Sequence, residues 1–251
     1  MSDNQPLALA PRRRAQAVRA MFARIARRYD LMNRLMTAGQ DVQWRKEVIR
    51  RAGLSAGESL LDLGAGTGDL AISAARQTPG LHPVAADFTL EMMQVGKRRL
   101  EQAPPPAKVT LPWIAADALE LPFAPESFHA VVSGFLMRNV TDLPRALAEQ
   151  YRVLKPGGRI VILDTTRPSR HWLAPLIRLH LHLVIPLLGR LIAGDSAAYT
   201  YLPDSTEAFL SAEELAARMT QAGFTQVGFV RRMFATMAIH WGLKPPSSHQ
   251  E

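Results

Sequence analysis

A short glycine-rich stretch carries residue types that could bind a nucleotide-like ligand: Gly64, Gly66 and Gly68 follow an apolar run that contains Asp62. Glycines let the backbone turn sharply and approach a ligand closely. A phosphate-binding loop would continue as Gly-Lys-Ser/Thr, which is absent here. A dinucleotide fingerprint spaces its glycines as Gly-x-Gly-x-x-Gly to seat a pyrophosphate, which the carboxylate of Asp62 would repel. The stretch therefore favours a ligand with a cationic group, such as an ammonium.

Two more carboxylates follow the next two apolar runs, where a nucleoside could be held. Asp87 stands 23 residues after Gly64, and its side chain could accept hydrogen bonds from both hydroxyls of a ribose. Asp117 could accept one from an adenine amino group, and Ala118 could offer its backbone N–H. A helix cap or a solvated turn is the alternative for each carboxylate taken alone. Their joint occurrence favours S-adenosylmethionine, which carries an ammonium group, a ribose and an adenine.

The apolar runs before these residues are expected to be strands of one sheet. They are mostly continuous rather than alternating, which suits a parallel sheet covered on both faces, and helical segments at 67–78, 90–102 and 142–154 separate them. A tight connection joins the last two runs, which indicates an antiparallel pair at one edge. The expected fold class is α/β: a doubly wound, Rossmann-like, seven-stranded, mainly parallel sheet with an antiparallel edge. The expected strands are Ser59–Gly64, His82–Phe88, Val109–Ala115, His129–Phe135, Arg159–Asp164, Gln226–Met233 and Thr236–Trp241.

Helical segments are also expected before and after this core. Apolar residues recur at helical spacing over residues 14–52, which predicts one or two amphipathic helices broken near Gly39. A later helix begins at Ser211, which forms a capping box with Glu214, and ends at Gly223. The expected divisions are a disordered basic tail (1–14), an N-terminal helical lid (15–52), the α/β domain (53–246) with a helical substrate insert (170–210), and a tail (247–251).

The net charge of +8 resides on the N-terminal arm: residues 1–51 hold 12 Lys/Arg and 4 Asp/Glu, whereas residues 52–251 hold 18 of each. Such an arm could meet nucleic acid or an anionic membrane surface, or it could be a solvated helical face. The chain has no cysteine, which excludes disulfides and thiolate metal sites and fits a reducing compartment. The sequence contains no run of 18 uncharged apolar residues, so no membrane span is predicted. The expected location is the cytoplasm, with peripheral contact to the inner face of the membrane as a candidate.

Three motifs resemble those of class I S-adenosylmethionine-dependent methyltransferases: LDLGAGTGDL at 61–70, Asp87, and LKPGGR at 154–159. A narrower resemblance, over roughly residues 20–243, is to the C-methyltransferase family of ubiquinone and menaquinone biosynthesis. It rests on FARIARRYDLMNRLM at 22–36, on Arg138-Asn139-Val140 and on DSAAYTYL at 195–202. The expected cofactor site comprises Asp62, Gly64, Gly66, Thr67, Asp87, Phe88, Asp117 and Ala118.

The narrower resemblance implies methylation of a ring carbon of a prenylated quinol, demethylmenaquinol to menaquinol or the ubiquinone counterpart. Four departures from the family pattern bear on the acceptor. Gly134 stands where many members carry serine, and GFLMRNV replaces SFGLRNV. The run DTTRP at 164–168 replaces EFSKP, and Pro203 interrupts the segment after Tyr201. The alternatives are another hydrophobic small-molecule acceptor, or a catalytically dead protein that binds nucleic acid or assembles with a partner.

Three residues are expected to act on the acceptor hydroxyl, whose proton must leave before the adjacent ring carbon becomes nucleophilic. Arg138 should face the cofactor crevice and stabilise a phenolate electrostatically, because a guanidinium is a poor base. Asn139 could orient the hydroxyl, and Tyr29 would arrive from the N-terminal lid. A surface ion pair is the alternative for Arg138, and core packing is the alternative for Tyr29. No metal is expected at the site.

The segment 171–192 carries a helical stripe of apolar residues. Core packing is the default interpretation, and the alternatives are a wall that accepts a prenyl tail or a face that docks to the bilayer interface. The expected partners are a prenylated quinol and, for the basic arm and this stripe, an anionic membrane. Nucleic acid is not an expected partner, and a homodimer is a further candidate.

Overall fold

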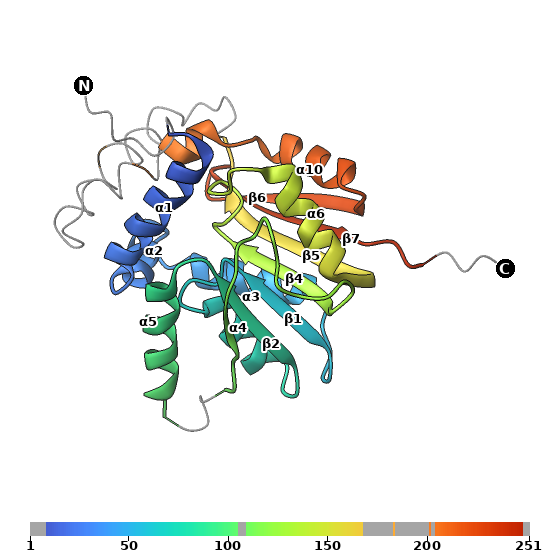
Figure 1. Cartoon of the computed structure of the whole chain (residues 1–251), viewed down its shortest axis with the longest axis horizontal. Coiled ribbons are helices and arrows are strands. Elements are labelled where there is room, and N and C mark those ends of the chain that lie inside the picture. Colours follow the sequence, from blue (N-terminus) through green and yellow to red (C-terminus); the bar gives the residue numbers. More distant parts are fainter. Residues whose placement is uncertain (1–8, 105–108, 168–182, 184–200, 202–203, 248–251) are drawn as a thin grey trace.

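The computed structural model describes residues 9–104, 109–167, 183, 201 and 204–247 (Figure 1). Its strands are β1 (Ser59–Leu63), β2 (His82–Asp87), β3 (Trp113–Ala115), β4 (Phe128–Gly134), β5 (Leu154–Thr165), β6 (Thr225–Arg232) and β7 (Met237–Leu243). Its helices with defined bounds are α1 (Pro11–Ile25), α2 (Tyr29–Met36), α3 (Asp41–Ala52), α4 (Asp69–Gln77), α5 (Leu90–Glu101), α6 (Leu143–Val153) and α10 (Ala212–Gln221).

All seven strands form one sheet in the order β3-β2-β1-β4-β5-β7-β6. Neighbouring strands from β3 to β5 are parallel, and β7 is antiparallel to both β5 and β6. The predicted mainly parallel sheet with an antiparallel pair at its edge is therefore confirmed. The strand order reverses between β1 and β4, which is where open α/β sheets bind ligands.

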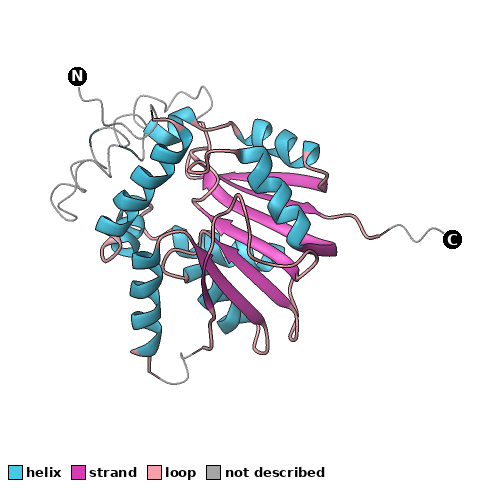
Figure 2. Cartoon of the chain, in the orientation of Figure 1, coloured by secondary structure: helices cyan, strands magenta, loops and turns pink. Residues whose placement is uncertain are grey.

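Helices cover both faces of the sheet (Figure 2), because successive residues of a buried strand point to opposite sides. On one face, Leu60 of β1 packs in an apolar cluster with residues of α3 and α4. On the other face, its neighbour Leu61 packs in a cluster with residues of α6 and α10. Burial on both faces explains why the strands read as continuous apolar runs in the sequence.

Two strands differ from their predicted ranges by more than two residues at one end. β3 covers only the last three of the seven residues predicted. β5 begins at Leu154, directly after α6, rather than at Arg159. The pairing is irregular there, since Phe128 pairs with Leu154 and Ala130 pairs with Arg159. The intervening residues bulge out of the ladder, with Gly157 at φ +78°. The bulge has the sequence Lys-Pro-Gly-Gly, which is typical of a turn, so the sequence does not indicate that the strand begins before it.

Three helices precede the sheet where one or two were predicted. α1 begins at Pro11, so residues 11–14, predicted to belong to a disordered tail, are helical. Proline suits this position because the first turn of a helix leaves its N–H groups unpaired. The break before α3 contains Gly39 at φ +77°, as predicted. The break between α1 and α2, at residues 26–28, contains neither glycine nor proline and so gave no signal in the sequence.

The predicted capping box of α10 is confirmed: Ser211 accepts from the backbone N–H of Glu214, and the Glu214 side chain accepts from that of Ser211. The predicted insert at 170–210, with its apolar stripe, lies mostly outside the described residues. None of the helices in the described part of the chain is sufficiently long and apolar to cross a membrane.

Candidate functional site

A cavity of about 740 Å³ opens beside the carboxyl ends of β1 and β4, where the strand order reverses. The turns after β1, β2 and β4 and several residues of α1 form its walls. Six of the eight residues predicted to bind a cofactor line it: Gly64, Gly66, Asp87, Phe88, Asp117 and Ala118. Tyr29 and Asn139, predicted at an acceptor, line the same cavity. The structure thus brings most of the predicted site together.

The turn after β1 requires glycine for two separate reasons. Gly64, Gly66 and Gly68 all have positive φ angles, of +67°, +57° and +78°, which side chains strongly disfavour. Space is also short: a Cβ on Gly64 would lie 2.9 Å from Cδ1 of Leu136. On Gly68 it would lie 2.5 Å from the ring of Trp113. The turn can therefore present bare backbone to the cavity.

Asp87 is fixed by the backbone around it. Its Oδ2 accepts a hydrogen bond from the N–H of Gly66 over 2.7 Å, and its Oδ1 accepts one from the N–H of Thr89 over 2.6 Å. Burial raises the pKa of Asp87, and these N–H donors work against that rise. Beside it, the Phe88 ring is 43% exposed, with the Arg19 guanidinium of α1 5.5 Å from its centroid. The carboxylate and the exposed ring together border the cavity.

Asp117 and Ala118 follow β3 at the same cavity. Asp117 is exposed, and its Oδ1 accepts from the N–H of Leu119 over 2.9 Å, which holds the carboxylate in a tight turn. Ala118 is buried beneath it. Both residues therefore lie where an adenine ring could rest against the end of β3.

Asp62 and Thr67 do not line the cavity, although both were predicted to bind the cofactor. Asp62 is 1% exposed, and its Oδ2 accepts from the N–H of Ala71 in the first turn of α4 over 2.9 Å. Burial raises the pKa of Asp62 to about 7. Its Oδ1 has no hydrogen-bond partner among the described residues. Asp62 thus holds the helix start, which was the alternative interpretation, and its contact with a cofactor stays a prediction.

Tyr29 and Asn139 approach the cavity from different elements. Tyr29 is the first residue of α2 and packs edge-to-face against Phe22 of α1, with ring centroids 5.7 Å apart. Burial raises the pKa of Tyr29, although the positive charge of Arg138 opposes the rise. Asn139 follows β4, and its Nδ2 donates to the carbonyl of Phe135 over 2.9 Å. A buried hydroxyl and a fixed amide therefore face one space.

Arg138 was expected to face the cavity, and the structure places it behind the wall instead. It is 5% exposed, and its Nη1 forms a 2.5 Å ion pair with Oδ1 of Asp164, which is fully buried. Its carbonyl oxygen accepts from Arg14 of α1 over 3.2 Å. Arg138 does not line the cavity in the described structure, so its direct contact with an acceptor stays a prediction.

Sequence reasoning did not assign a role to Asp164 or to Tyr201, both of which support predicted residues. The signal for Asp164 was a carboxylate at the end of an otherwise apolar strand, where only a partner makes burial tolerable. Tyr201 donates from its hydroxyl to Oδ1 of Asn139 over 3.0 Å. In the sequence, the segment of Tyr201 supports only the resemblance to the family. No spacing rule relates Tyr201 to Asn139, so the contact between them could not be predicted.

Comparison with known proteins shows which family this chain belongs to. The model of the ubiE/COQ5 methyltransferase family matches residues 11–244. The chain is 46% identical over 227 residues to the ubiquinone/menaquinone biosynthesis C-methyltransferase UbiE of Desulfotalea psychrophila, with 90% of each chain covered. It is 42% identical over 225 residues to the demethylmenaquinone methyltransferase of Thermus thermophilus, with 90% of this chain and 100% of that relative covered.

A solved structure shows the same fold at low sequence identity. The SAM-dependent methyltransferase from Aquifex aeolicus matches with a TM-score of 0.60 at 15% identity, and the match covers 86% of this chain and 97% of that chain. The family assignment rests on the sequence relatives and the family model rather than on this likeness. The chain belongs to the ubiE/COQ5 methyltransferase family.

Proposed function

We propose that the protein transfers the methyl group of S-adenosylmethionine to a ring carbon of a prenylated quinol, such as demethylmenaquinol or a ubiquinone precursor. One observation carries the proposal: Tyr29 and Asn139, expected at the acceptor, share a cavity with Gly66 and Asp87, expected at the cofactor. The named relatives are C-methyltransferases of quinone biosynthesis. A shared cavity lets donor and acceptor meet in a fixed geometry, which is the main requirement for methyl transfer.

The residues around the turn after β1 fit S-adenosylmethionine. Asp87 lines the cavity with its carboxylate held by the N–H groups of Gly66 and Thr89, where it can accept a hydrogen bond from a ribose hydroxyl. Asp117 and the N–H of Ala118 would hold the adenine, and the bare backbone of Gly64 and Gly66 would meet the amino-acid end. When bound, the cofactor supplies an electrophilic methyl group on a sulfonium.

The acceptor side supplies hydrogen-bond donors. The side-chain oxygen of Asn139 accepts from the Tyr201 hydroxyl, and one of its two N–H groups donates to the Phe135 carbonyl. The second N–H can therefore donate to a quinol oxygen. Tyr29 is protonated at neutral pH, as tyrosines ordinarily are, and burial raises its pKa further, so its hydroxyl can also donate. Donors aimed at the oxygen favour its phenolate form, which makes the adjacent ring carbon nucleophilic. Arg138 adds a positive charge from behind, which Asp164 partly offsets.

A labelling experiment tests the proposal. The protein is incubated under reducing conditions with methyl-labelled S-adenosylmethionine and either a short-chain demethylmenaquinol or a methoxy-benzoquinol analogue. Label on one ring is expected, and it identifies the acceptor class. An incubation with the oxidised quinones and without reductant is the control and should give no label, since a quinone has no hydroxyl to ionise. Label on neither quinol ring would overturn the proposal.

We further propose that the N-terminal helices rest on an anionic membrane at its cytoplasmic face, where prenylated quinols reside. Arg12 and Arg13 of α1 and Arg34 of α2 are exposed. On α2, Leu31 is 53% exposed and Leu35 is 43% exposed, so apolar and basic side chains share this helix. Sedimentation with vesicles of anionic lipid should carry the protein down at low salt and not at high salt. Equal recovery with neutral vesicles, or no recovery at low salt, contradicts this contact.

A further inference from the structure

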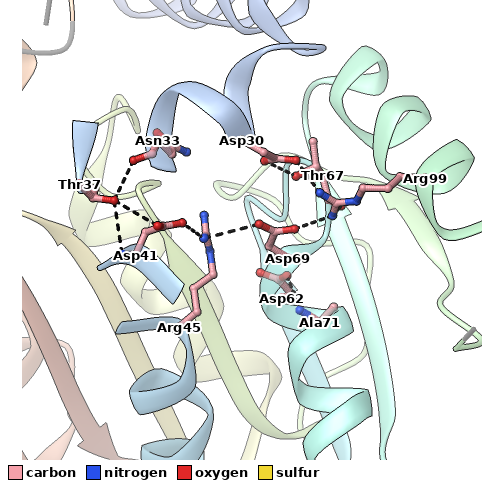
Figure 3. Close-up of polar contacts among 10 residues, drawn as sticks. All are labelled: Asp30, Asn33, Thr37, Asp41, Arg45, Asp62, Thr67, Asp69, Ala71 and Arg99. Atoms are coloured by element: carbon pink, nitrogen blue, oxygen red, sulfur yellow. Dashed lines mark hydrogen bonds and ion pairs between the residues drawn. The ribbon is translucent and has the colours of Figure 1, made fainter. Parts of the chain in front are cut away.

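Asp30, next to Tyr29 on α2, bonds to the turn that the cofactor is proposed to occupy. Its Oδ1 accepts a hydrogen bond from the hydroxyl of Thr67 over 2.8 Å, and its Oδ2 forms a 2.6 Å ion pair with Nη1 of Arg99 on α5 (Figure 3). Neither Asp30 nor Thr67 nor Arg99 lines the cavity. Asp30 therefore does not contact a ligand in this cavity directly, and it can influence the reaction through the residues that it positions.

Arg99 binds the same turn at two further points. Its Nη2 donates to the carbonyl oxygen of Thr67 over 3.0 Å and to Oδ1 of Asp69 over 2.5 Å. Helix α5 lies close to the turn because Gly96 has no side chain: a Cβ there would lie 2.4 Å from the Thr67 carbonyl oxygen. The Arg99 guanidinium thus contacts Asp30 and both ends of the Thr67–Asp69 segment at once.

A second chain of contacts reaches the same turn from α3. Arg45 pairs with Asp69, with 3.5 Å between its Nη1 and Oδ2, and also pairs with Asp41 (Figure 3). The hydroxyl of Thr37, the C-cap of α2, lies 3.1 Å from Oδ1 of Asp41 and accepts from the Asp41 N–H over 3.4 Å. Helix α2 is therefore tied to the turn at its first residues through Asp30 and at its C-cap through Thr37. Such a double attachment fixes the position of Tyr29.

We propose that Asp30 is a positioning residue for the methyl-transfer reaction, because it holds α2 against Thr67 and Arg99 and so places Tyr29 opposite the turn that binds the cofactor. The proposal rests on the proposed function. Burial and the neighbouring carboxylate of Asp69 raise the pKa of Asp30, so its charge depends on the bonds from Thr67 and Arg99. A small displacement of a residue that orients the acceptor can lower the rate by about 10- to 100-fold.

The positioning role of Asp30 must be separated from simple stabilisation of helix α2. Asp30 stands in the first turn of α2, where any carboxylate stabilises a helix by interacting with its dipole. Glu91 offers a matched control, since it stands exposed in the first turn of α5 and forms no contact with the turn after β1 in the described structure. Asp30→Ala and Glu91→Ala remove the same type of helix interaction, and only the first removes the bonds to Thr67 and Arg99.

The first measurement compares kcat and the Kd of S-adenosylhomocysteine for Asp30→Ala, Asp30→Asn and Glu91→Ala. We expect Asp30→Ala to lower kcat about 10- to 100-fold with a melting temperature close to that of Glu91→Ala. Asp30→Asn should recover part of the loss, because its amide oxygen still accepts from Thr67. A kcat for Asp30→Ala equal to that of Glu91→Ala would overturn the proposal, as would a loss that Asp30→Asn does not relieve.

The second measurement needs no acceptor, so it separates this proposal from the proposed function. Hydrogen exchange is followed over residues 29–36 with S-adenosylhomocysteine bound. Asp30→Ala and Arg99→Met should each speed exchange in this segment, and the double variant should exchange no faster than the faster single variant. Exchange unchanged in both single variants refutes the attachment. A wild-type protein that methylates no quinol, but shows this exchange pattern, refutes only the proposed function.

Discussion

The hydroxyl of Tyr201 donates to Oδ1 of Asn139 over 3.0 Å, and the Phe135 carbonyl accepts from Nδ2 of the same amide over 2.9 Å, so two bonds together fix the orientation of Asn139. The opposite orientation would set the amide oxygen of Asn139 against the Phe135 carbonyl, which can only accept, and would remove the bond from Nδ2. The free N–H of Asn139 is thereby directed to the remaining space. Tyr201 is only 4% exposed, so water does not readily replace it as the donor.

Tyr201→Phe should lower kcat by about tenfold, because it removes one hydrogen bond worth about 1.4 kcal/mol and leaves the Asn139 amide held by the Phe135 carbonyl alone. The Kd for S-adenosylhomocysteine should stay the same. Tyr151→Phe is the matched control, since the Tyr151 ring packs against Phe224, with centroids 5.2 Å apart, in the cluster under α6. Equal kcat for the two variants contradicts the role of Tyr201.

Asp87→Ala should weaken S-adenosylhomocysteine binding by at least about tenfold, or about 1.4 kcal/mol, because the ribose hydroxyls lose their acceptors. The change also frees the N–H of Gly66, which loosens the turn. Isothermal titration gives the affinity. Glu120→Ala is the control: this carboxylate also lines the cavity and its side chain is 86% exposed. If the two variants weaken binding equally, general charge rather than the geometry of Asp87 holds the ligand.

Arg138→Met should destabilise the fold by about 3–5 kcal/mol, because it leaves the buried carboxylate of Asp164 without its cation. Urea unfolding measures the free energy. The double variant Arg138→Met/Asp164→Leu should regain much of that loss, since no unpaired charge remains in the interior. A single variant within about 1 kcal/mol of wild type would show that the pair contributes little to stability.

The cofactor-free protein should lose stability as the pH rises toward 7. Burial raises the pKa of Asp62 to about 7 in the folded state, whereas the unfolded chain has an ordinary aspartate near pH 4. Between these values only the folded state holds the proton, so the free energy of unfolding falls as the pH rises, by up to about 4 kcal/mol.

Asp62→Asn should flatten this dependence, because asparagine keeps an acceptor for the N–H of Ala71 and does not titrate. Urea unfolding at several pH values between 4 and 8 gives the two curves. Glu91→Gln makes the same chemical change at an exposed position and should leave the wild-type slope in place. Parallel curves for wild type and Asp62→Asn would exclude Asp62 as the titrating group.

The sheet and the residues at its strand ends could be predicted because both depend on local features. Buried parallel strands are continuous apolar runs, and a ligand-binding turn after them needs glycine or a carboxylate. Asp87 closes β2 within one residue of the predicted end and lines the cavity. Gly64 and Gly66 have the positive φ angles that the spacing implied.

The direction of Arg138 could not be predicted, because it depends on backbone torsion and on a distant partner. Phe135 has a φ of +62°, which is uncommon for any residue other than glycine. After that turn Asn139 lines the cavity, whereas Arg138 meets Asp164, 26 residues further along the chain. No periodicity links two such residues. The same limit applies to Asp30 and Arg99, which are 69 residues apart.

Gly96 has a consequence for how the chain can vary. A Cβ at this position would lie 2.4 Å from the Thr67 carbonyl oxygen and 2.6 Å from the Trp113 ring. Arg99 stands almost one helical turn further along α5. Its distance to Asp30 therefore depends on the size of the residue at position 96, which sets how closely α5 approaches the turn. A homologue that keeps Asp30 and Arg99 but has a bulkier residue at position 96 would retain both charged side chains and lose the alignment between them. Substitutions at these three positions should therefore occur together across related sequences, with size and charge inherited as one unit.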